Sequence, residues 1–521
     1  MLPAQRERED YRDMRKLVTA AQWVVAILGS LIGIVLLAEK IFYSFDEMSE
    51  TYNFNLHHVV LGCLIYTALF LLIHVLLGKI RSTKRYIAAN IVIMLLFEMT
   101  FCLWLMTGSR IYWGSDPQAV YDLAVRFTQG DYSAVVPRDS YMALYPFQYG
   151  IISIYELLMR CTGILNGKLI QLMNIGLMMA GSLAGYGILW KITPRRLSVA
   201  VYSILWMTAF PLFFHAMVAY GDLPATALVL IALFFLLRTL GDGDRQGLHM
   251  ILATAACILA CIFKTNARVC MLAILLVSAV YFLINFDWKK VLWLLLTLVL
   301  AFSAVPLIQK SYEIRAGQES GSGIPMIAWI AMSMQEGLGG PGSWNGYHVD
   351  LYIRNDYDQE ATAQQVKKDM QRSMETFMGD PGYMLSFYTT KIAYQWTEGS
   401  YGGMDSLENT FGSDSKSPWV KSIMDGPVHG LFIRMANWHQ SVLYIAFMTA
   451  MILILKDLHR EKKFCWTKMY LVVMMIGGFL SELIWESASR HVMMYCVMMF
   501  PLAAEGVTRV CDAIRKRGAC D

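Results

Sequence analysis

The chain has 521 residues, of which 56% are hydrophobic and 16% are charged, and its net charge at pH 7 is +4. Soluble domains carry roughly 25% charged residues, and one soluble core could not bury so many long apolar runs. The composition therefore excludes an ordinary soluble enzyme. The sequence also lacks a long basic stretch with interleaved aromatic residues, which argues against nucleic-acid binding.

Apolar runs of roughly 20 residues recur along the chain and predict an all-α polytopic membrane protein with about twelve transmembrane helices. The expected spans are 17–38, 57–78, 86–106, 168–190, 198–215, 222–238, 248–264, 269–285, 290–308, 441–456, 468–486 and 491–508. The first sixteen residues are highly charged, and the run that follows them lacks a small-residue cleavage site. We therefore expect a retained first helix and not a cleaved signal peptide.

Lysine and arginine in the short connections predict the orientation, because they favour the cytoplasmic side. They gather at 6–16, 79–85, 191–196, 288–290, 456–463 and 515–517, so both termini are expected in the cytoplasm of a cell-membrane protein. Two apolar segments, 146–163 and 168–190, then lie where only one crossing is allowed. The shorter one, 146–163, carries Gln148, Glu156 and Arg160. We expect it to be an interfacial or re-entrant helix.

These assignments predict four parts of the chain. They are the N-terminus with two leading spans (1–85), a membrane core with outer loop 107–145 and interfacial helix 146–163 (86–308), an outer domain (309–440), and three last spans with a cytoplasmic tail (441–521). The outer domain is expected to have mixed structure. Within it, 358–378 has the apolar spacing of a helix, and 337–348 is a loop dense in Gly and Pro.

Two carboxylates, Asp116 and Asp122, follow the third span on the predicted outer side. If 117–128 is helical, their six-residue separation places them on different faces, so they would not act as a close pair. Asp116 precedes Pro117, which also makes it a candidate N-cap of that helix. Asp122 could equally face water.

Further ionisable groups lie at outer ends of the predicted spans, where charges indicate function by default. They are Asp222, which could also be an N-cap, the pair Lys264 and Arg268 in a tight turn, and Glu486, Arg490 and His491 in "ESASRH". Cations on this side oppose the positive-inside bias and need an anion, for which a lipid phosphate is suited. A carboxylate facing such cations fits transfer of a group from a phosphate-linked lipid.

Several chemistries have no motif in the sequence. There is no G-x-S-x-G, H-E-x-x-H or Walker A pattern. Of the ten cysteines, none lies between Cys270 and Cys465, which argues against a disulfide framework in the outer domain. No metal site is predicted and no cofactor is firmly implied, although the sequence leaves a divalent cation open.

The stretch "SDPQAVYDLAVRFTQGDYS…YMALYPFQYGIISIYELLM" resembles the first outer loop of C-type (GT-C) glycosyltransferases, the group with protein O-mannosyltransferases and lipid A aminoarabinose transferases. The matching residues are Asp116, Tyr121, Ala124, Gly130, Asp131, Tyr145 and Pro146. The resemblance implies that Asp116 is the catalytic base, that Asp222 is the second acidic position, and that Arg490 serves the lipid phosphate. His491 stands where the family usually has Tyr, and Asp116 is followed by Pro where many members have Asp-Glu.

This resemblance predicts an enzyme that moves a sugar from a polyprenyl-phosphate donor to an acceptor hydroxyl of a glycan, lipid or protein on the outer face. Asp116 would be the general base and Asp222 would orient the acceptor or the base, while Lys264, Arg268 and Arg490 would bind the donor phosphate. The remaining candidates, expected to contact substrate or support those that do, are Asp122, Tyr121, Tyr145, Gln148, Glu486, His491, Trp344 and Trp396.

Two other functions remain open from the sequence. A lipid or polysaccharide flippase would also have about twelve spans, but such transporters usually contain a structural repeat, and we find none. A surface-polysaccharide polymerase or ligase would use Arg and His of its outer loops and would not need Asp116.

Overall fold

A computed structural model describes residues 3–46, 51–109, 113–240, 245–411, 417–461 and 465–517. Residues 110–112 of the predicted outer loop lie outside this part. So do residues 462–464 and the side chains before residue 16 and after residue 515, which belong to the basic clusters used for the orientation. Within the described part the fold is helical, with one small hairpin of strands β1 (Ser44–Asp46) and β2 (Thr51–Asn53) after the first helix.

Eleven described helices are long and apolar enough to cross a membrane. They are α1 (Pro3–Phe42, apolar from Lys16), α2 (Leu56–Gly78), α3 (Thr83–Gly108), α7 (Lys168–Ile192), α10 (Asp222–Thr239), α11 (Gln246–Phe263), α12 (Ala267–Ile284), α13 (Trp288–Ala316), α20 (Pro427–Glu461), α21 (Trp466–Ile484) and α22 (Ser489–Arg517). The prediction of about twelve spans is confirmed if the bent pair described next counts as one.

The predicted span 198–215 is broken in two. Helix α8 (Arg196–Met207) and helix α9 (Phe210–Ala216) meet at an angle of 52°. Pro211 stands in the first turn of α9, where its missing N–H is tolerated, whereas inside one continuous helix it would remove a backbone hydrogen bond. The break therefore follows from the local sequence.

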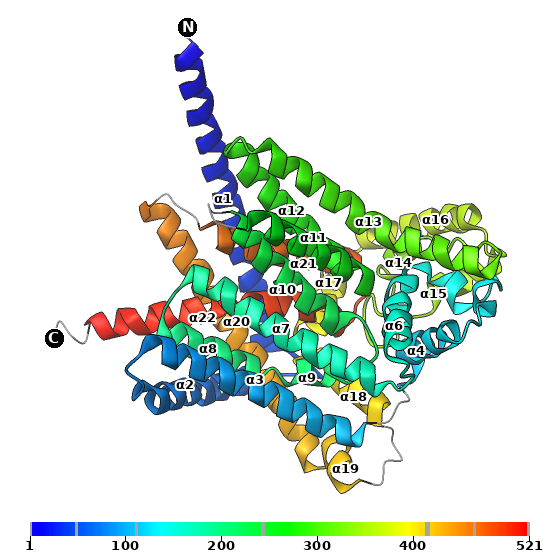
Figure 1. Cartoon of the computed structure of the whole chain (residues 1–521), viewed down its shortest axis with the longest axis horizontal. Helices are drawn as coiled ribbons and strands as arrows, with labels where there is room; N and C mark the ends of the chain where they lie inside the picture. Colours follow the sequence, from blue (N-terminus) through cyan, green and yellow to red (C-terminus); the bar gives the residue numbers. More distant parts are fainter. Residues whose placement is uncertain are drawn as a thin grey trace.

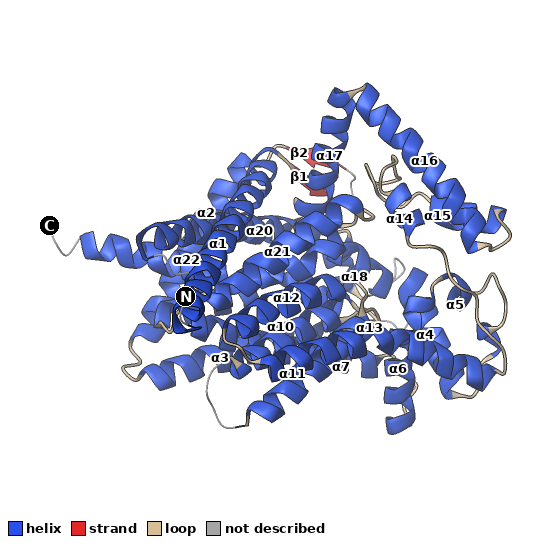
Figure 2. Cartoon of the chain, turned by 90° about the horizontal axis from the view of Figure 1, so that it is seen from above, coloured by secondary structure: helices blue, strands red, loops and turns tan. Residues whose placement is uncertain are grey.

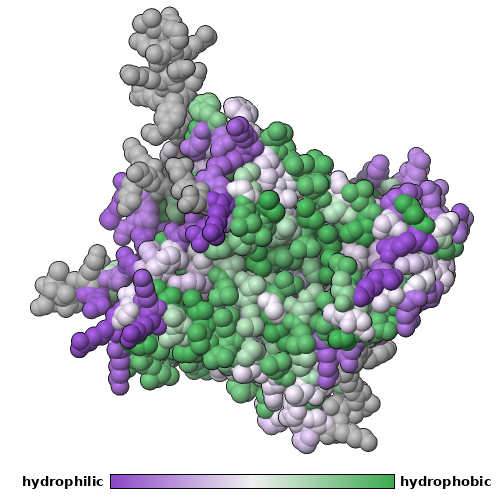
Figure 3. All heavy atoms as spheres, in the orientation of Figure 1, coloured by the Kyte–Doolittle hydropathy of each residue, from purple (hydrophilic) through white to green (hydrophobic). Residues whose placement is uncertain are grey.

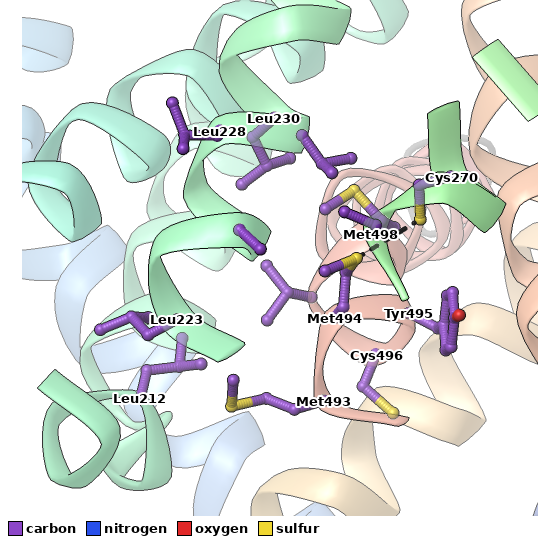
Figure 4. Close-up of a cluster of buried hydrophobic side chains, with 14 of the residues drawn as sticks. Leu212, Leu223, Leu228, Leu230, Cys270, Met493, Met494, Tyr495, Cys496 and Met498 are labelled. Carbon is purple, nitrogen blue, oxygen red and sulfur yellow. Dashed lines mark hydrogen bonds between the residues drawn. The ribbon is translucent and has the colours of Figure 1, made fainter. Parts of the chain in front are cut away.

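The bundle is built around α22. In its 18-residue apolar stretch 94% of the residues are buried, against 22% in the corresponding stretch of α13. Helix α22 packs against α7, α8, α10, α20 and α21 (Figure 1). Leu223 and Leu230 of α10 belong with Met494 and Met498 of α22 to one apolar cluster, in which the thiol of Cys270 on α12 lies 3.6 Å from the sulfur of Met494 (Figure 4). Flexible methionine side chains fill irregular gaps between such helices.

The apolar surface forms the middle of the face drawn in Figure 3, and hydrophilic residues gather toward its two ends. One end carries the C-terminus of α22, and the other is covered by shorter helices (Figures 1 and 2). We call the second one the outer end, the side on which the sequence places it. An apolar belt between two polar ends is the pattern of a membrane-spanning bundle.

The segment after α3 contributes the first group of short helices at the outer end. It forms α4 (Ser115–Thr128), η1 (Ser133–Val135), α5 (Tyr141–Leu144), η2 (Pro146–Gln148) and α6 (Tyr149–Thr162). Helix α6 corresponds to the predicted interfacial helix. Its fourteen residues reach about 21 Å, short of the roughly 30 Å of a bilayer core, and it packs against α4, α11 and α13.

The region 309–440 is helical in its described part, so the expectation of a mixed domain is wrong. It contains the end of α13, then α14 (Ile327–Met332), α15 (Tyr347–Arg354), α16 (Gln359–Gly379), α17 (Pro381–Trp396), α18 (Gly403–Phe411), α19 (Pro418–Met424) and the start of α20. Helix α16 matches the helix predicted over 358–378. The region is also divided, since α14–α16 have a small core of their own, whereas Trp396 and Phe411 belong to the main core.

Candidate active site

A cavity of about 730 Å³ opens at the outer end. It is formed by connections between helices, namely the start of α4, the turn before α6, the residues between α9 and α10, the α11–α12 turn, the segment around α14 and α15, and the α21–α22 turn. The candidates that line it are Asp116, Tyr145, Gln148, Lys264, Arg268, Trp344, Glu486, Arg490 and His491. Residues far apart in the sequence thus meet in one space.

Asp116 is held by hydroxyl groups. It is the second residue of α4, whose N-cap is Gly114, so the capping role considered for Asp116 is wrong. Tyr220 donates a hydrogen bond to Oδ2 of Asp116 (3.3 Å), and the Tyr141 hydroxyl is a second partner of this carboxyl. Gln148 connects the two tyrosines, because its Nε2 lies 2.9 Å from Tyr220 and 3.2 Å from Tyr141.

Three cations face the same cavity. Lys264 is 13% exposed and pairs with Asp222, with Nζ 3.0 Å from Oδ1. The guanidinium of Arg268 lies over the ring of Phe302, and that of Arg490 over the ring of Tyr220. Nε of each arginine is buried and has no hydrogen-bond partner within the described part of the chain.

Asp222 stands behind the cavity and does not line it. It is the first residue of α10, after Gly221, so it is not an N-cap either. A Cβ on Gly221 would lie 2.0 Å from the carbonyl oxygen of Phe263, so the start of α10 packs directly on the α11–α12 turn. This close approach, which only glycine permits, brings Asp222 to Lys264.

The far wall of the cavity is aromatic. Trp329 of α14 is nearly parallel to Trp485, with ring centroids 6.3 Å apart. The ring centroid of His348 lies 4.7 Å from that of Trp329. Tyr145 and Phe147 meet Trp329 edge to face. Flat aromatic faces of this kind offer apolar contact area at small conformational cost.

Burial changes the protonation of several groups around the cavity. Desolvation lowers the pKa of His348 to about 4, so this imidazole is neutral at pH 7. It raises the pKa of Glu486, against the opposing charge of Arg490. It lowers the pKa of Lys264, while the neighbouring Asp222 opposes that change. The pKa of Tyr220 is held well above its usual value, first by burial and then by the charge of Asp116, so its hydroxyl keeps its proton.

Three predicted residues lie away from the cavity. Asp122 is exposed and accepts a hydrogen bond from Gln118 (2.7 Å). The hydroxyl of Tyr121 donates to the carbonyl oxygen of Leu165 (2.6 Å). Trp396, expected to contact substrate or to support a residue that does, is fully buried in the main core, because α17 returns into the bundle.

Sequence reasoning missed Tyr220, Phe147, Trp329, Trp485 and His348, which also line the cavity. Three of them stand next to residues that were singled out, since Phe147 precedes Gln148, Tyr220 precedes the Gly–Asp pair at 221–222, and Trp485 precedes Glu486. That proximity was an available signal. The described part of the chain holds no group of three or more His, Cys, Asp or Glu side chains arranged for a metal ion.

Comparisons with known proteins give a family and distant structural likenesses. Residues 23–509 match the family described as "Conserved hypothetical integral membrane protein". No curated protein matches the chain.

Among solved structures, the chain is similar to the Archaeoglobus fulgidus oligosaccharyltransferase AglB in complex with an inhibitory peptide and a dolichol-phosphate (12% identity, TM-score 0.43, 84% of this chain and 52% of that one). A second structure of the oligosaccharyltransferase from this organism, tethered with an acceptor peptide, gives a TM-score of 0.44 at 12% identity, over 84% of this chain and 51% of that one. ArnT from Cupriavidus metallidurans bound to undecaprenyl phosphate follows (15% identity, TM-score 0.30, 82% and 78%). The chain spans about half the length of the oligosaccharyltransferase.

Proposed function

The chain belongs to the family of conserved hypothetical integral membrane proteins, and we propose that it is a glycosyltransferase that takes a sugar from a polyprenyl-phosphate donor and passes it to an acceptor hydroxyl on the outer face of the membrane. One observation carries the proposal. A carboxylate, Asp116, and three cations, Lys264, Arg268 and Arg490, share one cavity at the ends of membrane helices. Dolichol-phosphate and undecaprenyl phosphate, named in two of the similar structures, are of the proposed donor class.

The proposed reaction uses both sides of this cavity. Asp116 accepts the proton of the acceptor hydroxyl while the oxygen of that hydroxyl attacks the anomeric carbon of the sugar. The bond between that carbon and the phosphate oxygen breaks, and the electron pair leaves with the polyprenyl phosphate. The three cations stabilise the charge that develops on the phosphate. Asp222, which pairs with Lys264, holds this lysine at the cavity and does not contact substrate.

The place of the site favours a transferase over a transporter. The charged groups stand in turns or at helix ends, as Lys264 does between α11 and α12 and Glu486 between α21 and α22. Transporter sites generally lie near the middle of the bilayer, at broken helices related by a repeat. A cavity at the membrane surface is where a lipid phosphate and a water-soluble acceptor can meet.

Replacing Asp116 by asparagine tests the proposal. The purified full chain in lipid nanodiscs is given a panel of undecaprenyl-phosphate-linked radiolabelled sugars with a cell-envelope fraction as acceptor, and released undecaprenyl phosphate is measured. We expect the Asp116→Asn variant to lose about 10²–10⁴-fold in rate, because a general base contributes that much. Its binding of undecaprenyl phosphate should change little.

Asp122→Asn is the matched control. It makes the same chemical change six residues further along α4, at an exposed position outside the cavity, and should keep the wild-type rate. A wild-type rate in the Asp116→Asn variant would rule out the proposed base. Wild-type protein that moves lipid between leaflets, but turns over no donor, would contradict the transferase and favour a flippase.

A further inference from the structure

Tyr220 connects the two charged sides of the cavity. Its hydroxyl donates to Asp116 (3.3 Å) and receives a hydrogen bond from Gln148 (2.9 Å). Two of the cations lie over its ring: Nζ of Lys264 is 4.2 Å and the guanidinium carbon of Arg490 is 5.9 Å from the ring centroid. One side chain thus contacts the proposed base at its tip and the proposed phosphate ligands on its ring.

This arrangement keeps opposite charges apart within one cavity. Lys264 pairs with Asp222, and within the described part of the chain no lysine or arginine forms an ion pair with Asp116. A cation paired directly with Asp116 would stabilise the carboxylate and weaken it as a base. An aromatic ring attracts cations to its face, so the phenol ring offers Lys264 and Arg490 a partner other than Asp116.

We propose that Tyr220 is a positioning residue that aims the Asp116 carboxylate through its hydroxyl and, through its ring, holds Lys264 and Arg490 on the phosphate side of the cavity. This inference rests on the proposed function. The raised pKa of Tyr220 supports it, because the hydroxyl remains a donor over the working pH range. Its position directly before Gly221 supports it as well, since the close packing of Gly221 on Phe263 fixes the backbone there.

Two substitutions at Tyr220 should move the pH profile of kcat/KM in opposite directions. Tyr220→Phe keeps the ring but removes one hydrogen bond to the carboxylate. Asp116 then holds its proton to a higher pH, and the acid limb moves up by about half to one pH unit, as the loss of one such bond implies. Tyr220→Leu removes the ring as well as the hydroxyl, so the cations approach Asp116. An opposite charge close to a carboxylate lowers its pKa by about 1–3 units, which outweighs the effect of the lost hydrogen bond. The acid limb then moves down, and kcat falls more than about tenfold because the base is weaker.

The assay is the release of undecaprenyl phosphate from the donor that the wild type uses. Tyr281→Phe is the control, because the hydroxyl of Tyr281 donates to the carbonyl oxygen of Leu240 (2.8 Å) at the opposite end of the bundle. It should leave the acid limb unmoved. Tyr220→Phe keeps the bulk of the side chain and tests the hydroxyl even if Tyr220→Leu fails to fold.

The result separates this inference from the function on which it rests. Suppose that the Asp116→Asn variant is inactive. The role of Tyr220 alone is then overturned if the acid limb is unshifted in both Tyr220 variants, or if it shifts in the same direction in both. An active Asp116→Asn variant overturns the proposed base first, whatever the Tyr220 variants do.

Discussion

The arginines of the cavity each retain an unused hydrogen-bond donor. Nε of Arg268 and Nε of Arg490 are buried without a partner among the described residues. Leaving a charged donor unpaired is costly, and functional sites are where such groups persist. An oxyanion bound between these side chains would supply the missing acceptors, which is the physical basis for assigning the donor phosphate to this side.

Arg490→Lys tests that assignment at the residue scale. Lysine keeps the charge but loses the planar, forked donor geometry that matches phosphate. We expect KM for the donor to rise roughly 10- to 150-fold, since a charge-assisted hydrogen bond is worth about 1.5–3 kcal/mol, with a smaller change in kcat.

The control for this change is Arg509→Lys. Arg509 pairs with both carboxylate oxygens of Asp457 at the other end of the bundle (2.6 and 2.7 Å), and its replacement should leave KM unchanged. Equal KM values for wild type and Arg490→Lys would show that Arg490 does not bind the phosphate.

At the scale of elements, one buried lysine connects the segment after α14, on the aromatic side of the cavity, to the α21–α22 turn of the bundle. Lys391 of α17 is fully buried and donates to the carbonyl oxygens of Ser333 (3.0 Å) and Trp485 (2.9 Å). Beside it, the N–H of Ser487 donates to the carbonyl oxygen of Gly342 (2.8 Å). The segment after α14 and the α21–α22 turn are thereby held together, and with them the aromatic wall.

Replacing Lys391 by methionine should change how stability depends on pH. Burial lowers the pKa of Lys391 to about 7, whereas lysine in the unfolded chain titrates near 10.4. Between these values the unfolded chain binds more protons, so the free energy of unfolding of the wild type rises with pH. Relative to Lys391→Met, we expect a gain of about 1–2 kcal/mol between pH 7 and pH 9.

Thermal unfolding in detergent at several pH values measures this effect. Lys367→Met removes an exposed lysine of α16 and should follow the wild-type pH dependence. Parallel curves for wild type and Lys391→Met would mean that Lys391 titrates alike in the folded and unfolded chain, which would contradict the expected pH dependence.

At the scale of the whole molecule, the proposed function requires the outer end to face away from the cytoplasm. Among the described residues, three exposed cysteines report on this: Cys161 at the end of α6, and Cys465 and Cys511 at the other end of the bundle. In intact cells, a membrane-impermeant maleimide should label a variant that retains only Cys161. Variants that retain only Cys465 or only Cys511 should react after permeabilisation. The reverse pattern would place the cavity in the cytoplasm.

The sequence by itself determined the membrane helices and set 146–163 apart from them, because a bilayer demands about 20 apolar residues for each crossing and polar residues interrupt that pattern. It also located most charged residues of the cavity, since a charge at the end of a span is costly without a function. The bend between α8 and α9 also has a local signal, Pro211, although the predicted span 198–215 runs through it. The helical nature of 309–440 and the return of Trp396 into the core could not be foreseen.

Only the tertiary structure decided which candidates meet. Asp116, Tyr220, Lys264 and Arg490 come from four connections separated by whole spans, and no local pattern specifies their convergence. Asp122, six residues from Asp116, is excluded from the cavity because α4 turns it to another face. The only sequence signal for Tyr220 was its place before the Gly–Asp pair at 221–222, since a tyrosine acquires a role from what lies on either side of its ring.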